Sequence, residues 1–538
     1  MPSDTVTVPT PDLTGAAAAL DAGSAIVNLA IKRLASVGSV DDDQVLAYDV
    51  GHAAAAIETG RSMIDYGAKG SVEGQLTCVF IADVLADLAA KLWGREAIWG
   101  VDPSALAATI EFVTQWRDPA VMAALAYQDG DRFLDSDFGL VQDTFRRFAN
   151  EKVAPVAEHI HRENADIPED LIEGLSEMGL FGLSIPEEHG GFAMGGEGDY
   201  LGMIIATEEL SRASLCAAGS LITRPEILAR ALEAGGTPEQ KAKWLPQLAM
   251  GEKLNAIAVT EPDYGSDVAG LKVAALEAPG PNGEPGYAIT GVKTWCTFAA
   301  RADVMMVLAR TEPDPSLGHR GLSILIVPKD RGDSEGFELR QDGGGKMEGR
   351  PIDTIGYRGM HSYEVAFDNW WVPAENLIGM EEGRGKGFYY QMAGFENGRI
   401  QTAARAVGVM QAAYEEAKAY AENRVVFGQP ISEYQLTRVK LTRMAAIIQA
   451  SRQFSYQVGR LMAKGEGKME ASMIKAFVCK SSEWVTREAM QIHGGMGYAE
   501  EYNVSRHFVD ARVLSIFEGA DETLTLKVIT RALVNQAK

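Results

Sequence analysis

The stretch YAITGVKTWCT, residues 287–297, marks a change in the hydrophobic period of the chain from that of helices to that of strands. Two further short runs, 304–309 and 322–327, are rich in β-branched and other apolar residues, and Gly, Pro and Asp separate the runs. Short runs punctuated in this way are typical of strands joined by turns. We therefore expect a compact β-domain at about residues 256–380.

Helical patterns flank this β-domain on both sides. Before it, Ile81, Leu85, Leu88 and Leu92 recur at spacings of four, three and four, which places them on one helix face. After it, the apolar residues from Ile400 to Ala417 are spaced alternately three and four apart, which is the helical period. Helices with this period are what a four-helix bundle requires. The fold class expected is therefore mainly α with a central β-domain.

At 538 residues the chain exceeds the size of one compact core, so several packed units are expected. The patterns predict four parts: an additional N-terminal helical bundle at 1–132, a helical domain at 133–255, the β-domain at 256–380 and a C-terminal helical bundle at 381–538.

The composition excludes several classes of protein. The chain is 46% apolar and 23% charged, and 50 basic against 74 acidic side chains give a net charge of −24. Such a charge repels nucleic acid and anionic lipid, and no continuous apolar run predicts membrane insertion. The four cysteines have no paired spacing, so no disulfide framework or metal site is expected. The N-terminus lacks a basic segment followed by an apolar run, and we expect a cytoplasmic protein.

One turn in the β-domain could bind an anion. Ser266 lies between Gly265 and Asp267, and its hydroxyl and the free backbone N–H groups of such a turn can hold a pyrophosphate oxygen. A plain hairpin turn is the competing interpretation, and the three residues alone favour it. The Trp-x-Thr strand end at Trp295 and Thr297 reverses that preference.

Five motifs occur in one order along residues 133–538 and together resemble the acyl-CoA dehydrogenase family. They are Thr260-Glu261-Pro262 with Gly265-Ser266-Asp267, Gly291-Val292-Lys293-Thr294-Trp295-Cys296-Thr297, Arg424 with Phe427 and Gly428, Gln491 to Tyr498, and Ile516-Phe517-Glu518-Gly519. The resemblance implies the family fold, with a helical domain, a β-domain and a C-terminal four-helix bundle. The N-terminal bundle would be an addition to it.

The resemblance implies FAD as cofactor. Trp295 would pack on the isoalloxazine, Thr297 would hydrogen-bond near its N5, and Thr260 would meet the polar edge of the ring. Ser266 would hold the pyrophosphate.

A second group of residues would bind FAD across a subunit boundary. By resemblance, Arg424 and Phe427 would lie at the phosphates, and Gln491, Gly494 and Gly495 would approach the adenosine half of a neighbouring subunit's FAD. Taken alone, Arg424 reads as a solvated helix-end charge and the Gly-Gly pair as a helix cap. The family roles imply a homodimer or homotetramer, with electron-transferring flavoprotein as the acceptor.

Glu518 is the expected catalytic base. The α-proton of a thioester is too weakly acidic for a carboxylate in water, so the site must stabilise the enolate that forms and desolvate the base. Glu518 follows two apolar residues and precedes Gly519. A surface Glu beside a turn is the competing interpretation. By resemblance, the backbone N–H of Glu518 and the FAD ribityl hydroxyl would bind the thioester carbonyl.

Other family members carry the base immediately before an Arg on a bundle helix, but here Gly398 stands before Arg399. This favours Glu518, and Glu396 stays a weaker candidate. After Gly519 many members have Thr and then Gln two residues later, whereas this chain has Ala520, Asp521 and Glu522. One or two flavin hydrogen bonds are therefore in doubt.

The additional bundle resembles that of family members acting on a branched dicarboxylyl-CoA. The second carboxylate of such a substrate needs Arg, His, Tyr or N–H partners. The candidates are Arg399, His361 and Tyr363. Arg399 could instead be a solvated charge on its helix, and the loop at 358–363 could be surface of the β-domain. A dehydrogenase for another short or branched acyl-CoA remains open. Two other classes remain open as well: an acyl-CoA oxidase or related flavin monooxygenase, and a non-catalytic scaffold.

Overall fold

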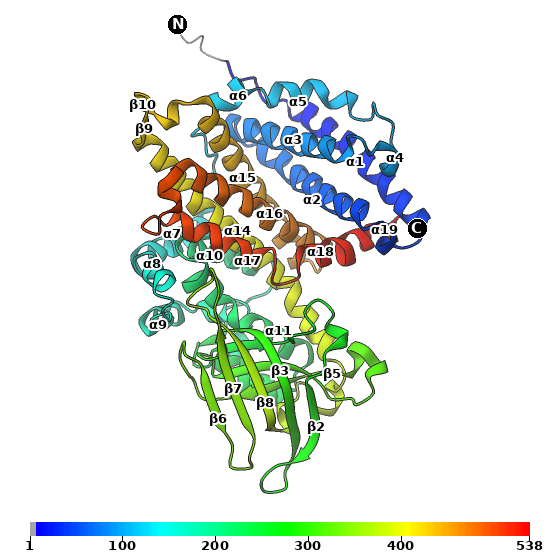
Figure 1. Ribbon diagram of the computed structural model, residues 1–538, viewed down its shortest axis with the longest axis vertical. Coiled ribbons are helices and arrows are strands. Elements are labelled where there is room, and N and C mark those ends of the chain that lie inside the picture. Colours follow the sequence, from blue (N-terminus) through cyan, green and yellow to red (C-terminus); the bar gives the residue numbers. More distant parts are fainter. Residues whose placement is uncertain (1–6) are drawn as a thin grey trace. The chain divides into compact units, whose positions relative to one another are not determined.

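The computed structural model describes residues 7–538, and packing divides the chain into two compact units. The first unit combines the chain up to Asp143 with Thr402–Lys538, and the second is Thr144–Gln401. The chain passes between them within α7 (Ser136–Phe148) and α14 (Gly387–Asn423). Both units are drawn in Figure 1.

The first unit is helical except for one small hairpin. Its elements are α1 (Leu13–Val37), α2 (Gln44–Gly67), α3 (Ser71–Leu92), α4 (Glu96–Trp99), α5 (Ile110–Trp116), α6 (Pro119–Ala124), the hairpin strands β9 (Val425–Val426) and β10 (Gln429–Pro430), α15 (Gln435–Ala463), α16 (Lys468–His493), α17 (Val504–Leu514), α18 (Asp521–Thr523), the π-helix η13 (Leu524–Thr530) and α19 (Arg531–Gln536).

The N-terminal helices do not form a separate core in the first unit. Helices α1, α2 and α3 pack on one another, and α2 and α3 also pack against α15, while α2 contacts α16 and η13. Their apolar faces thus share one interior with the C-terminal helices. The four-part division expected from the sequence remains a prediction, because packing groups its first and last parts together.

Helix α1 is long and apolar enough to cross a membrane by composition alone. Its Leu20, Ile26, Ala30 and Leu34 are nevertheless buried, and the helix packs on α2 and α3. A helix in the core of a folded unit has the same apolar composition, so the packing of α1 accounts for its hydropathy.

The second unit contains the eight-stranded sheet and the helices around it. Its helices are α8 (Ala154–Arg162), α9 (Glu169–Glu177), α10 (Glu197–Ala213), α11 (Arg224–Gly235), α12 (Pro238–Ala249) and α13 (Met380–Gly383). Its strands are β1 (Asn255–Ala258), β2 (Ala274–Pro279), β3 (Pro285–Thr297), β4 (Val304–Arg310), β5 (Leu322–Pro328), β6 (Phe337–Arg340), β7 (Lys346–Ile352) and β8 (Ser362–Pro373). The expected strands at 287–295, 304–309 and 322–327 are confirmed.

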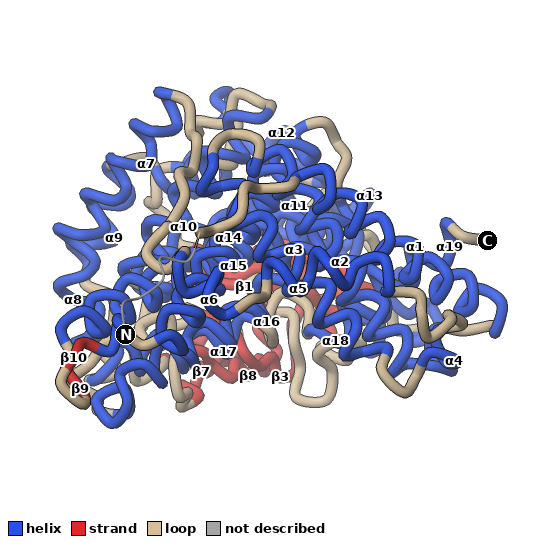
Figure 2. The backbone as a smooth tube through the Cα atoms, turned by 90° about the horizontal axis from the view of Figure 1, so that it is seen from above, coloured by secondary structure: helices blue, strands red, loops and turns tan. Residues whose placement is uncertain are grey.

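The sheet is mixed. Its order is β1-β4-β2-β3-β8-β7-β6, with β5 pairing on β4; β1 runs parallel to β4, whereas β3 and β8 are antiparallel. Ile227, Leu232 and Trp244 of α11 and α12 pack on Met306 and Leu308 of β4. Figure 2 shows the strands gathered in one region, apart from the small hairpin β9–β10.

Gly51 tests how closely α2 packs on η13. A Cβ at this position would lie 2.6 Å from both Thr525 Cγ2 and Thr530 Oγ1. In a helix, replacing Gly by Ala ordinarily stabilises by up to about 1 kcal/mol, whereas overpacking costs about 1–3 kcal/mol. We expect Gly51→Ala to lower the free energy of unfolding. Gly139→Ala in α7, where a Cβ meets nothing within 4 Å, serves as the control in thermal denaturation; a Gly51→Ala protein melting at or above the wild-type temperature contradicts the packing.

Candidate active site

The turn that carries Glu518 is held by a buried lysine from a different helix. The ammonium of Lys475, on α16 and 1% exposed, donates hydrogen bonds to the carbonyls of Phe517 (2.9 Å) and Gly519 (2.7 Å). Glu518 itself has φ +56° and Gly519 has φ +100°. A left-handed backbone is unfavourable for a residue with a Cβ, by about 1–2 kcal/mol, so the two charge-assisted hydrogen bonds hold a conformation that the chain would otherwise leave.

The Glu518 carboxylate is largely enclosed within this unit. Its side chain is 10% exposed, and Arg405 Nη2 lies 4.0 Å from its Oε1. Among the described residues no group donates a hydrogen bond to its Oε2. The Arg405 guanidinium also lies over the Phe517 ring, 5.4 Å from the centroid. One carboxylate oxygen is thus near a buried cation and the other is available to accept a proton.

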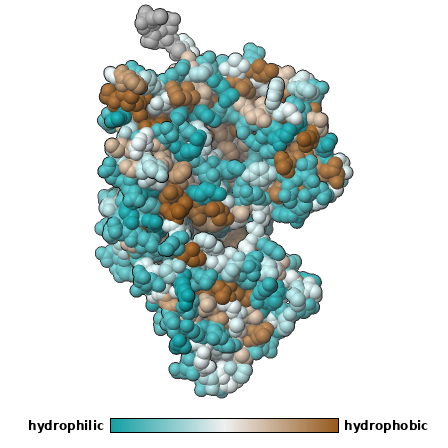
Figure 3. Space-filling model, in the orientation of Figure 1, coloured by the Kyte–Doolittle hydropathy of each residue, from teal (hydrophilic) through white to brown (hydrophobic). Residues whose placement is uncertain are grey.

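Arg424, at the end of α14, precedes a tight hairpin on the surface of the same unit. The two residues at its tip, Phe427 (φ +51°) and Gly428 (φ +90°), have the left-handed backbone that a two-residue hairpin turn favours. Phe427 is 96% exposed and Val425 is 57% exposed. Figure 3 shows an apolar patch at the place of β9 and β10. The exposed Val425 and Phe427 together form an apolar patch, and exposed apolar patches are typical of contact surfaces.

The α16 terminus offers a second open surface in the first unit. Gln491, Gly494 and Gly495 are exposed, and a Cβ at either glycine would meet nothing within 4 Å. A dinucleotide can therefore approach the backbone there without a steric clash. This exposure is compatible with the predicted role of these residues at FAD, which remains a prediction.

A buried ion pair lies close in sequence to two of the predicted flavin residues of the second unit, Thr260 and Trp295. Lys293, fully buried, donates to Glu261 Oε1 and to the Val259 carbonyl, both at 2.9 Å. Burial lowers the pKa of Lys293 although the Glu261 carboxylate opposes the shift. Glu261 also accepts hydrogen bonds from the backbone N–H groups of Lys272 and Val273. The pair fixes the segment around Thr260 beside β3, where Thr294 N donates to Thr260 O at 2.8 Å.

A bulge in β3 turns Trp295 outward. The register against β8 shifts between Lys293 and Cys296, Trp295 has φ +57°, and its side chain is 55% exposed, whereas Cys296 is buried. Bulges re-aim single side chains in this way. The indole face and the half-buried Thr297 are thus presented on one side of the strand, and Ser266 is exposed in its turn. This arrangement fits an isoalloxazine and a pyrophosphate.

His361 and Tyr363 have structural contacts instead. Tyr363 is fully buried in β8 and its hydroxyl donates to the Asp333 carbonyl at 3.2 Å. His361 Nε2 lies 3.1 Å from the Asn164 carbonyl and Nδ1 lies 3.4 Å from Asp166. The Tyr363 hydroxyl and His361 Nε2 are thus engaged with backbone carbonyls, whereas His361 Nδ1 makes only the longer approach to Asp166. These contacts support the β-domain, and a role at the substrate remains a prediction.

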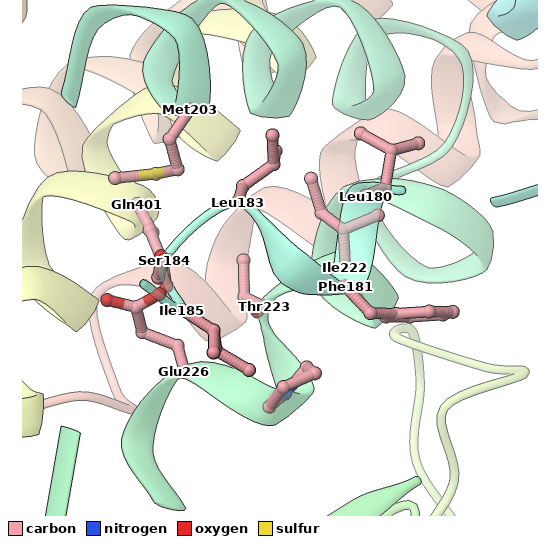
Figure 4. Close-up of a pocket in the computed structure, with 11 residues that line it drawn as sticks. Leu180, Phe181, Leu183, Ser184, Ile185, Met203, Ile222, Thr223, Glu226 and Gln401 are labelled. Carbon is pink, nitrogen blue, oxygen red and sulfur yellow. The ribbon is translucent and has the colours of Figure 1, made fainter. Parts of the chain in front are cut away.

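A pocket within the second unit contains residues that the sequence analysis did not single out. Its lining is Leu180, Phe181, Leu183, Ser184, Ile185, Met203, Ile222, Thr223, Pro225, Glu226 and Gln401. Figure 4 shows the polar ends of Ser184, Glu226 and Gln401 on one side and the apolar Leu180, Phe181 and Ile222 on the other. Arg399, half-buried, lies two residues before Gln401 on α14.

Arg224 stands between two pocket-lining residues and begins α11. It is 5% exposed, its Nε has no hydrogen-bond partner, and its side chain forms no ion pair with any residue from 7 to 538. The nearby Glu226 is already engaged, since its Oε1 accepts from Arg230 Nε (3.0 Å) and Asn397 Nδ2 (3.1 Å). A buried, unpaired guanidinium is costly. In the sequence, the run Thr223-Arg224-Pro225-Glu226 interrupts an apolar stretch, and this feature could have singled out Arg224.

The comparisons with known proteins identify the family of this chain. A model described as the acyl-CoA dehydrogenase N-terminal domain matches residues 136–252, its middle-domain counterpart matches 256–370 and its C-terminal counterpart matches 385–534. The chain belongs to the acyl-CoA dehydrogenase family. Residues before 136 lie outside these matches.

Three relatives of this acyl-CoA dehydrogenase illustrate the similarity. The (2S)-methylsuccinyl-CoA dehydrogenase of Cereibacter sphaeroides is 43% identical over 404 residues, covering 75% of this chain and 70% of that protein. The structure of butyryl-CoA dehydrogenase from Megasphaera elsdenii has a TM-score of 0.66 at 30% identity, covering 75% and 99% of the two chains. A glutaryl-CoA dehydrogenase from Mycobacterium smegmatis in complex with FADH2 has a TM-score of 0.65 at 25% identity, covering 76% and 97%.

The family assignment makes the chain an FAD-dependent oxidoreductase that acts on acyl-CoA thioesters. Its fold of helical regions around a central mixed sheet matches the expectation from the sequence. The individual residue roles at the flavin and at Glu518 remain predictions, which the local geometry of each unit supports.

Lys475 provides a test of the turn. Lys475→Met would leave the Phe517 and Gly519 carbonyls without this donor. We expect it to lower the free energy of unfolding by about 2–6 kcal/mol, since each of the two losses costs about 1–3 kcal/mol. Flavin reduction by substrate should slow roughly tenfold or more, because a base misplaced by about 1 Å loses much of its effect. Stopped-flow absorbance measures the rate. Lys464→Met, at an exposed site, should change neither quantity; equal effects in both variants would contradict this role.

Proposed function

We propose that this dehydrogenase oxidises (2S)-methylsuccinyl-CoA to mesaconyl-CoA. Glu518 would remove the α-proton of the thioester, with Oε2 as the accepting atom. Lys475 would keep the carboxylate in place through the backbone on either side of it. When bound, FAD supplies a hydride acceptor for the β-carbon. Arg405, 4.0 Å from Oε1, would orient the carboxylate and interact more weakly with it once it is protonated.

The observation that carries the substrate assignment is the buried Arg224. A monocarboxylyl thioester has only an apolar acyl end, and no group on it would compensate a desolvated guanidinium. The distal carboxylate of methylsuccinyl-CoA would form the charge-assisted, bidentate contact that arginine favours. The N-terminal end of α11, which begins at Arg224, adds a partial positive charge of the same sense. Arg399 remains a second candidate for this carboxylate.

The relatives support the same assignment at a coarser level. The 43% identical relative is named for methylsuccinyl-CoA, whereas others at lower identity are named for 2-methylacyl-CoA and isovaleryl-CoA. All of these names describe branched acyl groups. Branching at the α-carbon and a terminal carboxylate together distinguish the proposed substrate from the alternatives.

We further propose that the enzyme works as a homodimer or homotetramer in the bacterial cytoplasm and passes its electrons to an electron-transferring flavoprotein. The exposed Val425 and Phe427, with the open backbone at Gly494 and Gly495, would meet the FAD of a second copy. The description of one structural neighbour names the electron transferring flavoprotein of Acidaminococcus fermentans. All four cysteines lie among the described residues, form no disulfide there and are buried, which suits a reducing compartment.

The test is anaerobic bleaching of the flavin with a panel of acyl-CoAs. We expect (2S)-methylsuccinyl-CoA to bleach the flavin fastest, and butyryl-CoA and isovaleryl-CoA to do so at least tenfold more slowly. Arg224→Met should remove most of this preference, since loss of a buried charged contact costs about 3–5 kcal/mol. The matched control is Arg340→Met, which removes an arginine on β6 whose side chain is 69% exposed and which pairs with Glu338 outside the pocket.

Three results would count against the assignment. A preference for a monocarboxylyl-CoA in the parent enzyme would contradict the substrate. An unchanged selectivity in Arg224→Met, at full flavin content, would contradict the role of Arg224. Rapid peroxide formation in air with no need of a flavoprotein acceptor would identify an oxidase.

A further inference from the structure

The carboxylate of Asp521, three residues after Glu518, is bound by side chains from the N-terminal region. Asp521 is 7% exposed at the start of α18. Its Oδ2 accepts a short hydrogen bond from the Tyr48 hydroxyl, and His52 Nε2 lies 3.2 Å from the same oxygen. Lys480 of α16 completes the set with Nζ at 3.5 Å. Tyr48 and His52 belong to α2, in the segment that precedes the family match.

The groups around Asp521 also contact one another. Lys480 Nζ donates to the Tyr48 hydroxyl at 2.6 Å, the Tyr48 and His52 rings are 4.6 Å apart edge to face, and His52 Nε2 lies 3.3 Å from Thr525 Oγ1. Burial alone would raise the pKa of Asp521, but the His52 and Tyr48 hydrogen bonds and the nearby charges outweigh it and lower that pKa to about 2. The carboxylate therefore stays ionised and bound at neutral pH.

Asp521 closes the loop that carries the base. Its backbone N–H donates to the Ser515 carbonyl at 3.1 Å, so residues 515–521 form a closed loop with Glu518 near its middle. The loop is held at three points. Ser515 Oγ donates to Glu483 Oε1 (2.5 Å), Lys475 holds the carbonyls beside Glu518, and the Asp521 side chain is held by α2. Only the third point depends on residues outside the family match.

This anchor differs from the other contacts between the same elements. Thr530 Oγ1 donates to the Ala47 carbonyl at 2.7 Å, and Lys527 pairs with Asp41. Both contacts attach α2 and the segment before it to η13, beyond the loop. They can fix the N-terminal region to the bundle without touching residues 515–521, and so they provide a control for simple attachment.

Asp521 lies between Ala520 and Glu522, the two positions at which this chain departs from the family motif. Its side chain points into the cluster with Tyr48 and His52. Asp521 and α2 are therefore joined directly, one residue away from each of these departures.

We propose that Asp521 is a positioning residue, through which Tyr48 and His52 of the N-terminal region hold the loop that carries Glu518. The additional helices are then part of the framework of the base. The inference rests on the proposed role of Glu518 in α-proton removal. It does not depend on which acyl-CoA is the substrate.

The test compares Tyr48→Phe, His52→Ala and His52→Gln with Asp41→Asn in the full-length holoenzyme. The substrate is whichever acyl-CoA bleaches the wild-type flavin fastest, and flavin content and thermal stability are recorded for each variant. Two readouts follow: kcat and KM with protium or deuterium at the substrate α-carbon, and hydrogen–deuterium exchange of the backbone amides of residues 515–521.

We expect Tyr48→Phe and His52→Ala to lower kcat about tenfold with KM within twofold, and to raise the α-deuterium isotope effect on kcat, because proton removal becomes more rate-limiting. Amide exchange in 515–521 should accelerate at least tenfold. His52→Gln retains an N–H donor and should recover kcat to within threefold of wild type. Asp41→Asn should leave kcat, the isotope effect and the exchange of this loop unchanged.

The proposal is overturned if Tyr48→Phe, which removes a single hydroxyl, turns over within twofold of wild type, or if Asp41→Asn slows the reaction as much. It is also overturned if exchange accelerates in 515–521 while kcat and the isotope effect stay constant. Should His52→Ala yield no folded flavoprotein, Tyr48→Phe decides. If no acyl-CoA bleaches the wild-type flavin, the proposed function fails, and the exchange measurement still reports whether α2 holds the loop.

Discussion

The ammonium of Lys475 donates hydrogen bonds to the carbonyls on both sides of Glu518, and the placement of the base depends on these two contacts. A residue with a Cβ in the left-handed region relaxes unless its surroundings hold it. Lys475 projects from α16, a helix packed against α2, α15 and α17. The position of the base therefore depends on the packed helices of the bundle and not on the turn alone.

The second unit uses a buried charge in a similar way. Lys293 and Glu261 are both buried and satisfy each other together with three backbone groups. Such a pair gives little net stability, because desolvation offsets most of the attraction. What it gives is a fixed geometry for the turn and the bulge that present Ser266 and Trp295. Arg224 differs, because its Nε has no hydrogen-bond partner and its side chain forms no ion pair among the described residues. That difference is the basis of the proposal that Arg224 binds a substrate carboxylate.

The sequence predicted the features that are local. Strand runs, the helical period around Ile400 and the Glu518 motif depend on neighbouring residues, and the structure has a β-domain and helical regions at the expected places. The outward rotation of Trp295 could be anticipated only by resemblance, because it arises from a bulge. Lys475, in the apolar run 471–479, gave a weak signal, since a lone lysine in such a helix more often reaches solvent than two distant carbonyls.

Contacts between distant residues could not be predicted in this way. The bonds from Tyr48 and His52 to Asp521 span about the whole chain, and neither partner has a distinctive neighbourhood in sequence. The same limit explains His361 and Tyr363, whose residue types suit a carboxylate site but whose polar atoms bind backbone and Asp166. Packing also joined the N-terminal helices to the C-terminal bundle, since the apolar faces of both sets need partners.

The central claim is that the Glu518 carboxylate removes the α-proton, and Glu518→Gln tests it most directly because the amide keeps the size and hydrogen-bonding reach of the side chain. The measurement is the rate of anaerobic flavin bleaching after mixing with the preferred acyl-CoA. The account predicts a yellow protein with wild-type flavin content whose bleaching is slower by about 100-fold to 10,000-fold, the usual contribution of a general base. Bleaching at the parent rate would contradict it.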